Sequence, residues 1–527
     1  MSDDHHNLYA ALRAGFPAQL DAIVIETGDG HRAPQHYTWR DLDRGSAMMA
    51  NLLQWLALPP GARVVMQVEK SVEALMLYLG VLRAGLVAVP LNTAYQAGEM
   101  AHFIADAQPA VVVCSGKHFP WLSRIAFQHG TAHVFTLDED RSGSLLERAA
   151  HQPDEQAPVP RSAADLACLL YTSGTTGRSK GAMLTHGNML ANARVLQGYW
   201  GWRTPEQGGD VLIHALPIFH VHGLFVACHG ALLNGSRMIW FGRFDPGAVI
   251  RRFAEATVFM GVPTMYVRML ADTALTPETC ASMRLFLSGS APLSVETFEA
   301  WRRRSGHTIV ERYGMTETIM LTSNPYHGDP AQRRGGTVGR PLPGVQLRVR
   351  DDQSLDCASG DTGHIEVKGP SVFAGYWQML EKSQESFTAD GWFKTGDVGR
   401  FDDAGNLTIV GRSKDLIISG GYNVYPAEVE QEVNELPGVA ESAVIGVPHP
   451  DFGEAVVAVV VPRPGAALQP DELMAALKGR LASFKLPKRV FVAPELPRNT
   501  MGKVQKNLLR ERHREVFHAP GQAASRD

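Results

Sequence analysis

The sequence has few cysteines and no long apolar run. Its five cysteines are far apart in a chain of 527 residues and form no CxxC pair: Cys114, Cys168, Cys228, Cys280 and Cys357. The odd number and wide spacing of these cysteines argue against a disulfide framework or a structural zinc site, and favour a reducing compartment. No apolar stretch reaches membrane-spanning length, and the acidic start "MSDDHH" lacks the apolar core of a signal peptide. We therefore expect a cytoplasmic protein with no membrane partner.

Strong charge of one sign is also missing. Lys and Arg number 50 against 54 Asp and Glu, which gives a net charge of −4, and no basic block stands out. A nucleic-acid partner is therefore not expected. The 45% of apolar and 20% of charged residues are ordinary for a globular enzyme, and the length allows more than one domain. Composition leaves the oligomeric state open between a monomer and a homodimer.

The first part of the chain alternates short β-branched runs with helical patterns. Residues 62–68 and 86–91 read as strands, and residues 71–85 and 97–108 as helices, with Ser71 as the first N-cap. A second passage of this kind runs through "LACLLYTS", "GDVLIHALP", "SRMIWF" and "ATVFMGVP". The rhythm predicts an α/β fold with largely parallel sheets covered by helices.

The pattern changes near residue 340, where glycine-rich short strands predict an antiparallel or barrel-like region. After residues 412–415 a compact α+β unit follows, with helices expected over 427–436 and 471–484 and strands between them. We predict a large N-terminal domain over residues 1–413 and a small, mobile C-terminal domain over residues 414–527.

The stretch "YTSGTTGRSK" (171–180) has the composition of a phosphate-binding loop. Its glycines can expose successive N–H groups to an anion, its hydroxyls add donors and its lysine adds positive charge. Ser179 precedes Lys180, so the spacing excludes a Walker A loop, which needs glycine there. The candidate anion ligands are Thr172, Ser173, Gly174, Thr175, Thr176, Gly177 and Lys180.

This stretch resembles the signature of the adenylate-forming superfamily of acyl-CoA synthetases, adenylation domains and luciferases. The other motifs of that family occur in the family's order: "LPIFHVHGLF", "FLSGSAPL", "ERYGMTE", "WFKTGDVG", "GRSKD" and "LPRNTMGKVQK". The resemblance implies the substrates ATP and coenzyme A, with Mg²⁺ as a cofactor. It also implies nucleotide contacts at Ser290, Ala291, Glu311, Arg312, Tyr313, Gly314, Met315, Asp397 and Arg412.

The resemblance assigns further roles by position. Thr316 would contact the α-phosphate and Glu317 the Mg²⁺, Lys503 would catalyse adenylation, and His220 would gate the path between the carboxylate and the thiol. Acetylation of Lys503 would remove the charge that adenylation needs and so act as a switch. Lys414 takes the hinge position, and the residues on the coenzyme A side are Gly420, Gly421 and Lys485.

Longer stretches, among them residues 69–95 and 212–227, are similar to bacterial malonyl-CoA synthetases. A second carboxylate on the acid would need a basic partner, preferably arginine. Arg268 and Arg284 are the two candidates, and the alternative role for each is a surface or structural ion pair. Val221 and Met315 would limit the size of a substituent on the acid.

Several alternatives remain open at this stage. His220 and His222 could be a metal pair, although no further ligand has a suitable spacing. The acid could be another short-chain or aryl carboxylate. The chain could also be a silent nucleotide-binding scaffold, which the joint presence of Glu317, Asp397 and Lys503 argues against, or a carrier-loading adenylation domain.

Overall fold

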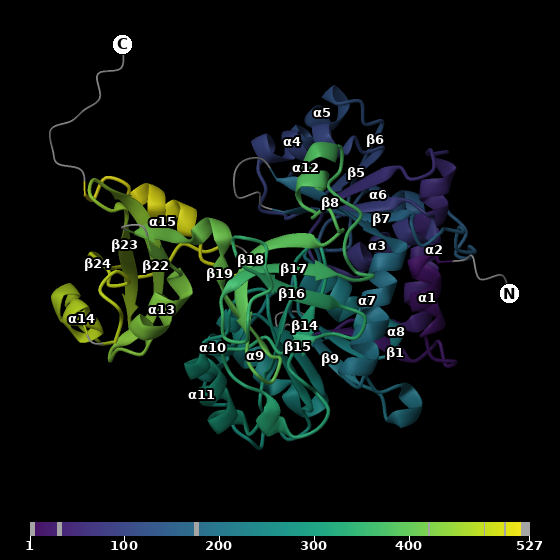
Figure 1. Ribbon diagram of the computed structural model, residues 1–527. Helices are drawn as coiled ribbons and strands as arrows, with labels where there is room; N and C mark the ends of the chain where they lie inside the picture. The colour runs from purple at the N-terminus through teal and green to yellow at the C-terminus, as the bar shows by residue number, and fades with distance from the viewer. Residues whose placement is uncertain are drawn as a thin grey trace, which may run out of the picture. The chain divides into compact units, whose positions relative to one another are not determined.

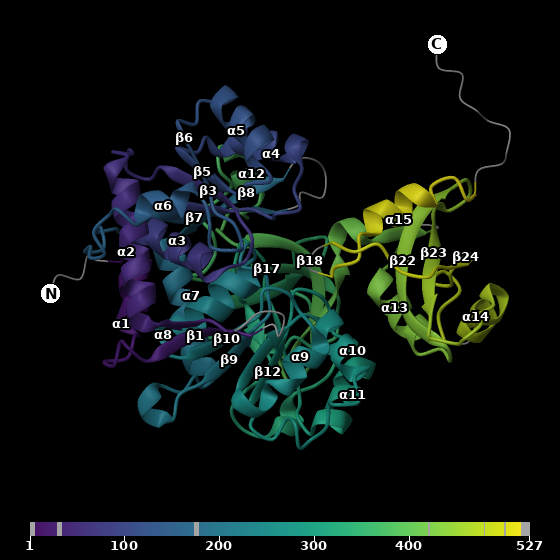
Figure 2. The same cartoon turned by 180° about the vertical axis from the view of Figure 1, so that it is seen from behind.

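The computed structural model describes residues 6–28, 34–172, 179–419, 422–478, 480–499 and 502–517 (Figures 1 and 2). Its contacts divide the chain into two compact units. Unit 1 comprises Met1–Gly289, Val295–Gln346 and Val367–Phe393, and unit 2 comprises Ser290–Ser294, Leu347–Glu366 and Lys394–Asp527. The proposed boundary between residues 413 and 414 lies inside unit 2 and stays a prediction.

A six-stranded sheet forms the first part of unit 1. Its order is β6 (His133–Thr136), β5 (Val111–Cys114), β3 (Arg63–Gln67), β4 (Val87–Pro90), β7 (Leu166–Thr172) and β8 (Lys180–Thr185). All neighbours are parallel except β7 and β8, which pair antiparallel. The parallel strands are buried because helices cover them, which explains their continuous runs of valine and alanine. The predicted strands over 62–68 and 86–91 are confirmed.

A nine-stranded sheet forms the rest of unit 1. Its order is β15 (Arg340–Pro341), β14 (Thr322–Ser323), β13 (Val310–Tyr313), β12 (Leu285–Ser288), β11 (Val258–Gly261), β9 (Val211–His214), β10 (Arg237–Trp240), β1 (Ile23–Thr27) and β2 (His36–Thr38). The central strands from β13 to β1 are parallel. The α/β class with parallel sheets is therefore confirmed.

Helices of unit 1 connect these strands. They are α1 (Leu8–Ala14), α2 (Trp39–Trp55), α3 (Val72–Arg83), α4 (Ala97–Ala107), α5 (Phe119–Gln128), α6 (Ser144–Ala149), α7 (His186–Tyr199), α8 (His229–Leu233), α9 (Pro246–Arg251), α10 (Pro263–Leu270), α11 (Val295–Ser305) and α12 (Leu380–Glu385). Short helical turns are η1 (Pro205–Gln207), η3 (Phe253–Glu255) and η4 (Pro330–Gln332), and η2 (His222–Cys228) is a π-helix. The Ser71 side chain caps α3 by accepting from the Ala74 N–H at 3.0 Å, as predicted.

Strands β16 (Gln346–Arg350), β17 (Gly363–Lys368), β18 (Phe393–Phe401) and β19 (Leu407–Arg412) form a four-stranded sheet in that order. Strands β18 and β19 pair antiparallel, as expected for this glycine-rich region. The short turn η5 (Ser413–Asp415) follows directly. Among the described residues, β16 and β19 are the outer strands of this sheet.

A five-stranded sheet forms the C-terminal part of unit 2. Its strands are β20 (Ile417–Ser419), β21 (Tyr422–Val424), β22 (Val439–His449), β23 (Gly453–Pro462) and β24 (Arg489–Val492). Alternate residues of β22 and β23 point to opposite faces, and both faces are buried. Helices α13 (Pro426–Asn434) and α14 (Pro470–Leu477) cover one face, and α15 (Lys506–Arg512) covers the other (Figure 1).

The helix predicted over residues 471–484 is too long. Helix α14 ends at Leu477 because Lys478 takes an extended backbone, and Lys478 then forms an isolated bridge with Leu481. Within the described ranges, no helix is both long and apolar enough to cross a membrane.

Candidate active site

The carboxyl ends of the parallel strands in the nine-stranded sheet are aligned. Trp240 at the end of β10 pairs with His214 at the end of β9, and Gly261 at the end of β11 pairs with Ser288 at the end of β12. Ser288 also pairs with Glu311 of β13. Ligands of open α/β sheets bind outside this edge. The edge therefore places the segments at residues 214–222, 286–289 and 311–317 at one candidate site.

The motif "ERYGMTE" covers the end of β13 and the turn after it. Glu311 and Arg312 are buried, Tyr313, Gly314, Met315 and Thr316 are half-buried, and Glu317 is 5% exposed. A side chain at position 314 would collide with the Ile319 carbonyl group, which explains the glycine. The Met315 carbonyl oxygen accepts from the Thr318 and Ile319 N–H groups and so fixes the turn. These contacts position Glu317 in the turn that follows β13.

Lys180 and Glu317 are linked through Tyr376. The Lys180 Nζ lies 4.5 Å from the centre of the Tyr376 ring, and the Tyr376 hydroxyl donates to Glu317 Oε1 at 2.8 Å. A bridge between Ala182 and Tyr376 holds the ring beside β8. The link joins the lysine of the phosphate-loop motif to the proposed metal-binding carboxylate. Sequence reasoning missed Tyr376, whose only local signal is an aromatic pair after a glycine.

The lysine is poised for a negatively charged ligand. Burial, and then the charge of Lys382, lower the pKa of Lys180, whereas Glu317 and Glu385 raise it. Thr172 pairs with Lys180 in the β7–β8 ladder, so the two ends of the intervening loop are adjacent. The predicted ligands Ser173, Gly174, Thr175, Thr176 and Gly177 lie outside the described residues.

Asp397, Arg412 and Lys503 come together in unit 2. Asp397 and Arg412 are partners in the β18–β19 ladder, and the Arg412 Nε lies 2.7 Å from Asp397 Oδ1. Lys503 is exposed, and its ammonium group interacts electrostatically with both members of this pair. Partial desolvation and the Arg412 charge lower the pKa of Lys503, and Asp397 raises it. Asp397, Arg412 and Lys503 span 106 positions of the sequence and thus form one polar cluster.

Other predicted residues of unit 2 occupy the following positions. Ser290 and Ala291 are half-buried, and Ser290 has a positive φ of 71°. Lys414 lies in η5, next to an Asp415 that accepts from Arg510 at 2.6 Å. Lys485 donates to Glu428 on α13 at 2.7 Å. The predicted residues Gly420 and Gly421 lie outside the part of the chain that is described.

His220 lies two residues before the π-helix η2. Its Nδ1 accepts from the His222 N–H at 3.2 Å, and its carbonyl oxygen accepts from the Leu224 N–H at 2.9 Å. Val221 is buried beside it. A π-helix was not predicted, although such turns are frequent at functional sites. Across the described ranges, no cluster of three or more His, Cys, Asp or Glu side chains could hold a metal ion, so the histidine-pair metal site gains no support.

Arg284 forms a buried structural ion pair. Its Nε donates to Asp210 Oδ1 at 2.7 Å, its Nη2 contacts Oδ2, and its Nη1 donates to the Trp200 carbonyl oxygen. Burial would raise the pKa of Asp210, but Arg284 outweighs it and the pKa is lowered. Arg268 is exposed on α10, with its guanidinium 5.1 Å from the centre of the Phe244 ring. Neither arginine presents a buried, unpaired guanidinium group.

This pairing gives a stability prediction. Arg284→Met should lower the free energy of unfolding by about 3–5 kcal/mol, because it leaves the fully buried Asp210 carboxylate without its cation. Urea unfolding measures the change. Acid selectivity of the folded variant should stay as in the wild type. A stable Arg284→Met variant with a lost affinity for its acid would instead make Arg284 a ligand-binding residue.

Arg312, unlike Arg284, is a buried arginine with guanidinium nitrogens that lack a partner among the described residues. It is 3% exposed, and its Nε and Nη2 have no hydrogen-bond partner among the described residues. Burial lowers its pKa to about 9. Ser288, one strand away, has a buried Oγ that likewise lacks a partner within the described structure. Gly289 leaves room for the guanidinium, since a Cβ there would collide with it. Unsatisfied donors of this kind fit an anion that the chain itself does not supply.

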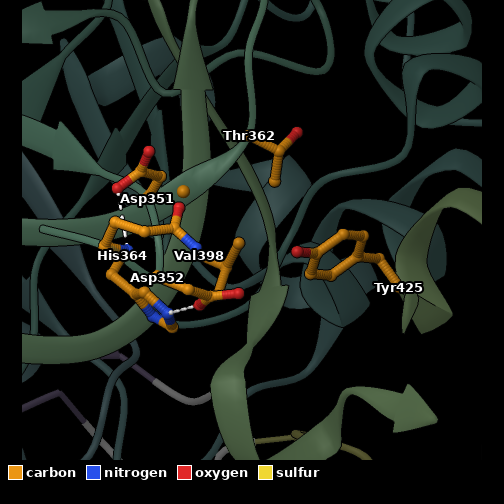
Figure 3. A pocket seen from close by; sticks show the side chains of 8 residues that line it. Asp351, Asp352, Thr362, His364, Val398 and Tyr425 are labelled. Atoms are coloured by element: carbon orange, nitrogen blue, oxygen red, sulfur yellow. Dashed lines mark hydrogen bonds and ion pairs between the residues drawn. The ribbon is translucent and has the colours of Figure 1, made fainter. Parts of the chain in front are cut away.

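A separate cavity of about 150 Å³ lies in unit 2 (Figure 3). Its lining includes Asp351, Asp352, Thr362, His364 and Tyr425. His364 Nε2 lies 3.0 Å from Asp352 Oδ1. Val398 of the motif "WFKTGDVG" also lines it, but none of the residues predicted for the site does, and Asp352 is 72% exposed. The cavity is therefore not part of the candidate active site.

Comparison with known proteins agrees with this geometry. Residues 14–377 match the AMP-binding enzyme family, and residues 428–503 match the AMP-binding enzyme C-terminal domain. A malonate–CoA ligase from Arabidopsis thaliana is 35% identical over 483 residues, covering 86% of this chain and 78% of that protein. A feruloyl-CoA synthase from Amycolatopsis sp is 36% identical over 484 residues, covering 90% and 94%.

A solved structure is more similar still. The crystal structure of ATP-bound MatB from Rhodopseudomonas palustris has a TM-score of 0.93 and 50% identity, and covers 97% of this chain and 100% of that chain. The family match spans more than half of the sequence and includes the β7–β8 hairpin, the "ERYGMTE" turn and Tyr376. The chain therefore belongs to the AMP-binding enzymes.

Proposed function

We propose that this enzyme joins malonate to coenzyme A through an acyl-adenylate, with release of AMP and pyrophosphate. The observation that carries the proposal is the buried guanidinium of Arg312, whose Nε and Nη2 have no partner in the described structure. The malonate–CoA ligase relative and the family membership support the same reaction.

The charge of Arg312 favours a dicarboxylic acid. A buried cation without a counter-ion is costly, and burying a second carboxylate without a cation is equally costly. Malonate brings one carboxylate to react and a second to pair with Arg312. The planar guanidinium can donate two parallel hydrogen bonds to that group. A monocarboxylate would leave Arg312 unpaired.

The first step is attack of the malonate carboxylate on the α-phosphate of ATP. An oxygen–phosphorus bond forms and pyrophosphate leaves, so catalysis depends on positioning and on donors to the phosphate oxygens. We assign Lys180, Thr172 and Thr316 to the phosphates, Lys503 to the reacting centre, and the Asp397–Arg412 pair to the ribose. Tyr313, Gly314, Met315, Ser290, Ala291 and Glu311 are assigned to the nucleotide on the family motif.

Glu317 is the residue proposed to hold Mg²⁺. Its carboxylate is buried, supplies the oxygen ligands that this cation prefers, and is linked through Tyr376 to Lys180. The bound ion would neutralise charge on the phosphate oxygens. Tyr376 orients the carboxylate by donating to Oε1.

In the second step the thiol of coenzyme A attacks the acyl carbon, and AMP leaves with the carboxylate oxygen. We propose that the C-terminal domain, residues 414–527, turns about Lys414 between the steps. Lys503 then leaves the site, and Gly420, Gly421 and Lys485 serve the thiol side. His220, Val221 and Met315 are assigned to the acyl side, where they would limit substituents.

A second candidate acid is an aryl or short-chain monocarboxylate, which the feruloyl-CoA synthase relative favours. A pyrophosphate-release panel over malonate, methylmalonate, acetate, propionate and ferulate separates the two. We expect malonate to be fastest, methylmalonate slower and acetate about 100-fold slower, because an unpaired buried charge costs several kcal/mol. An acetate or ferulate rate above the malonate rate would reject the malonate assignment.

The pH dependence of adenylation should report the charge of Lys503. The pKa of Lys503 lies below the ordinary 10.5, chiefly through desolvation and Arg412. The ammonium form exists below this pKa, so the adenylation rate should fall as the pH rises through it. Arg412→Gln removes one lowering charge and should move this alkaline limb to higher pH in a pre-steady-state profile. A limb that stays in place or moves to lower pH would contradict the assignment.

A further inference from the structure

A chain of polar contacts begins at Lys70, which has no role in the reaction described above. The Lys70 Nζ lies 2.9 Å from His214 Nδ1, 2.9 Å from the His214 carbonyl oxygen and 2.7 Å from the Phe241 carbonyl oxygen. The ammonium also lies 4.4 Å from the centre of the Trp240 ring. Lys70 therefore joins the carboxyl ends of β9 and β10.

His214 continues the chain on its other side. Its Nε2 lies 2.8 Å from the Gly223 carbonyl oxygen and 3.2 Å from the Cys228 Sγ. Because a carbonyl oxygen can only accept, Nε2 must carry the hydrogen. Burial lowers the pKa of His214 well below its usual range, so the ring is neutral and Nδ1 is an acceptor. Lys70 must then donate to Nδ1.

The charge of Lys70 is consistent with that role. Burial lowers the pKa of Lys70 to about 7. Its three acceptors and the Trp240 ring favour the ammonium form, which has one hydrogen for each acceptor. Protonated Lys70 thus donates to Nδ1 and stabilises the Nε2–H tautomer of His214.

Gly223 connects this chain to His220. It lies in η2, packed so closely on Pro217 that a Cβ would collide with the Pro217 carbonyl oxygen. His220 lies two residues before η2, and its ring accepts from the His222 N–H while its carbonyl oxygen accepts from the Leu224 N–H. A hydrogen bond from His214 to Gly223 therefore holds the turn that orients the His220 ring.

We propose that Lys70 and His214 are positioning residues that fix the orientation of His220 at the acyl side of the site. The inference rests on the proposed function in one respect, because His220 is assigned to the acyl side there. Residues that hydrogen-bond to a histidine without touching the substrate fix its tautomer and ring orientation. They therefore commonly control the function of that histidine. Lys70 and His214 lie 144 positions apart, so sequence patterns alone do not connect them.

The tautomer can be tested without any kinetic assay. Nitrogen-15 NMR of the histidine-labelled enzyme below pH 7, with His214 identified by its loss in His214→Gln, should show hydrogen on Nε2. In Lys70→Met the Nδ1 signal should move toward that of a nitrogen without a hydrogen bond. Hydrogen on Nδ1 in the wild type, or an unmoved Nδ1 signal in Lys70→Met, would overturn the inference.

Steady-state kinetics of variants then test whether Lys70 and His214 position His220. Lys70→Met should raise KM for malonate about tenfold and leave KM for ATP unchanged, because misorientation affects the acyl side alone. His214→Gln, which keeps a donor for the Gly223 carbonyl oxygen, should be affected less than His214→Leu. Lys117→Met is the matched control, since Lys117 pairs with Glu69, next to Lys70, at 2.9 Å. Equal increases in the KM for malonate and the KM for ATP would show a general loss of structure in the variant. That result would refute the positioning role of Lys70. Failure of the proposed acid would appear instead as an inactive wild type with the expected tautomer.

Discussion

Lys503→Ala is expected to abolish adenylation and to spare thioester formation. The variant should lose roughly 10²- to 10³-fold in the rate of pyrophosphate release, because it removes a cation that stabilises charge at the reacting phosphate. When malonyl-adenylate is supplied, conversion to malonyl-CoA should stay within roughly twofold of wild type, since the proposed domain rotation removes Lys503 from the site before this step. Both rates can be measured by quenched flow.

The matched control for this variant is Lys506→Ala. Lys506 lies three residues away and pairs with Glu430 at 2.6 Å, so it tests the loss of a neighbouring cation without loss of the proposed catalytic group. Acetylation of Lys503 should reproduce the selective defect, because it removes the same charge. Equal loss of both half-reactions in Lys503→Ala would contradict the two-conformation account. Unchanged activity after complete acetylation would refute the proposed switch.

Arg312→Met is expected to invert the choice of acid. The ratio kcat/KM for malonate should fall by about 10²- to 10³-fold, because the distal carboxylate would be buried without its cation. The value for propionate should rise relative to malonate, since methionine offers an apolar surface of similar length. Arg312→Lys should be intermediate, because it keeps the charge and loses the paired donors.

Arg268→Met is the matched control for Arg312→Met. Arg268 is the other arginine predicted for the acyl pocket, and it is exposed on α10. Its removal should leave the ratio of malonate to propionate activity close to wild type. An unchanged ratio in Arg312→Met together with a large loss in Arg268→Met would transfer the distal carboxylate to Arg268.

Local patterns predicted the elements that local interactions decide. The β3–α3–β4 segment was predictable because its buried runs, its period and the Ser71 cap all agree. The end of α14 was mispredicted because residues 471–484 keep an apolar period that the backbone does not follow past Leu477. The π-helix η2 could not be predicted, since its wider turn depends on packing of Gly223 against Pro217.

The candidate site likewise contains residues that the sequence predicts and residues whose role only the fold reveals. Motif resemblance identified Lys180, Glu317, Asp397, Arg412 and Lys503, and the structure brings the first two together and the last three together, each within one unit. The roles of the arginines could not be read from the sequence. Asp210, which pairs with Arg284, lies 74 positions away, and no local feature marks that partnership. Burial without a partner, which singles out Arg312, is likewise a property of the folded chain.

The most direct test of the account follows the oxygen atoms of the acid. The enzyme is incubated with malonate labelled with ¹⁸O in both carboxylates, ATP, Mg²⁺ and coenzyme A, and the products are examined by mass spectrometry. Attack of the carboxylate on the α-phosphate, followed by thiol attack on the acyl carbon, must leave one ¹⁸O atom in AMP and none in pyrophosphate. Labelled pyrophosphate, or malonyl-CoA formed with unlabelled AMP, would contradict the acyl-adenylate route.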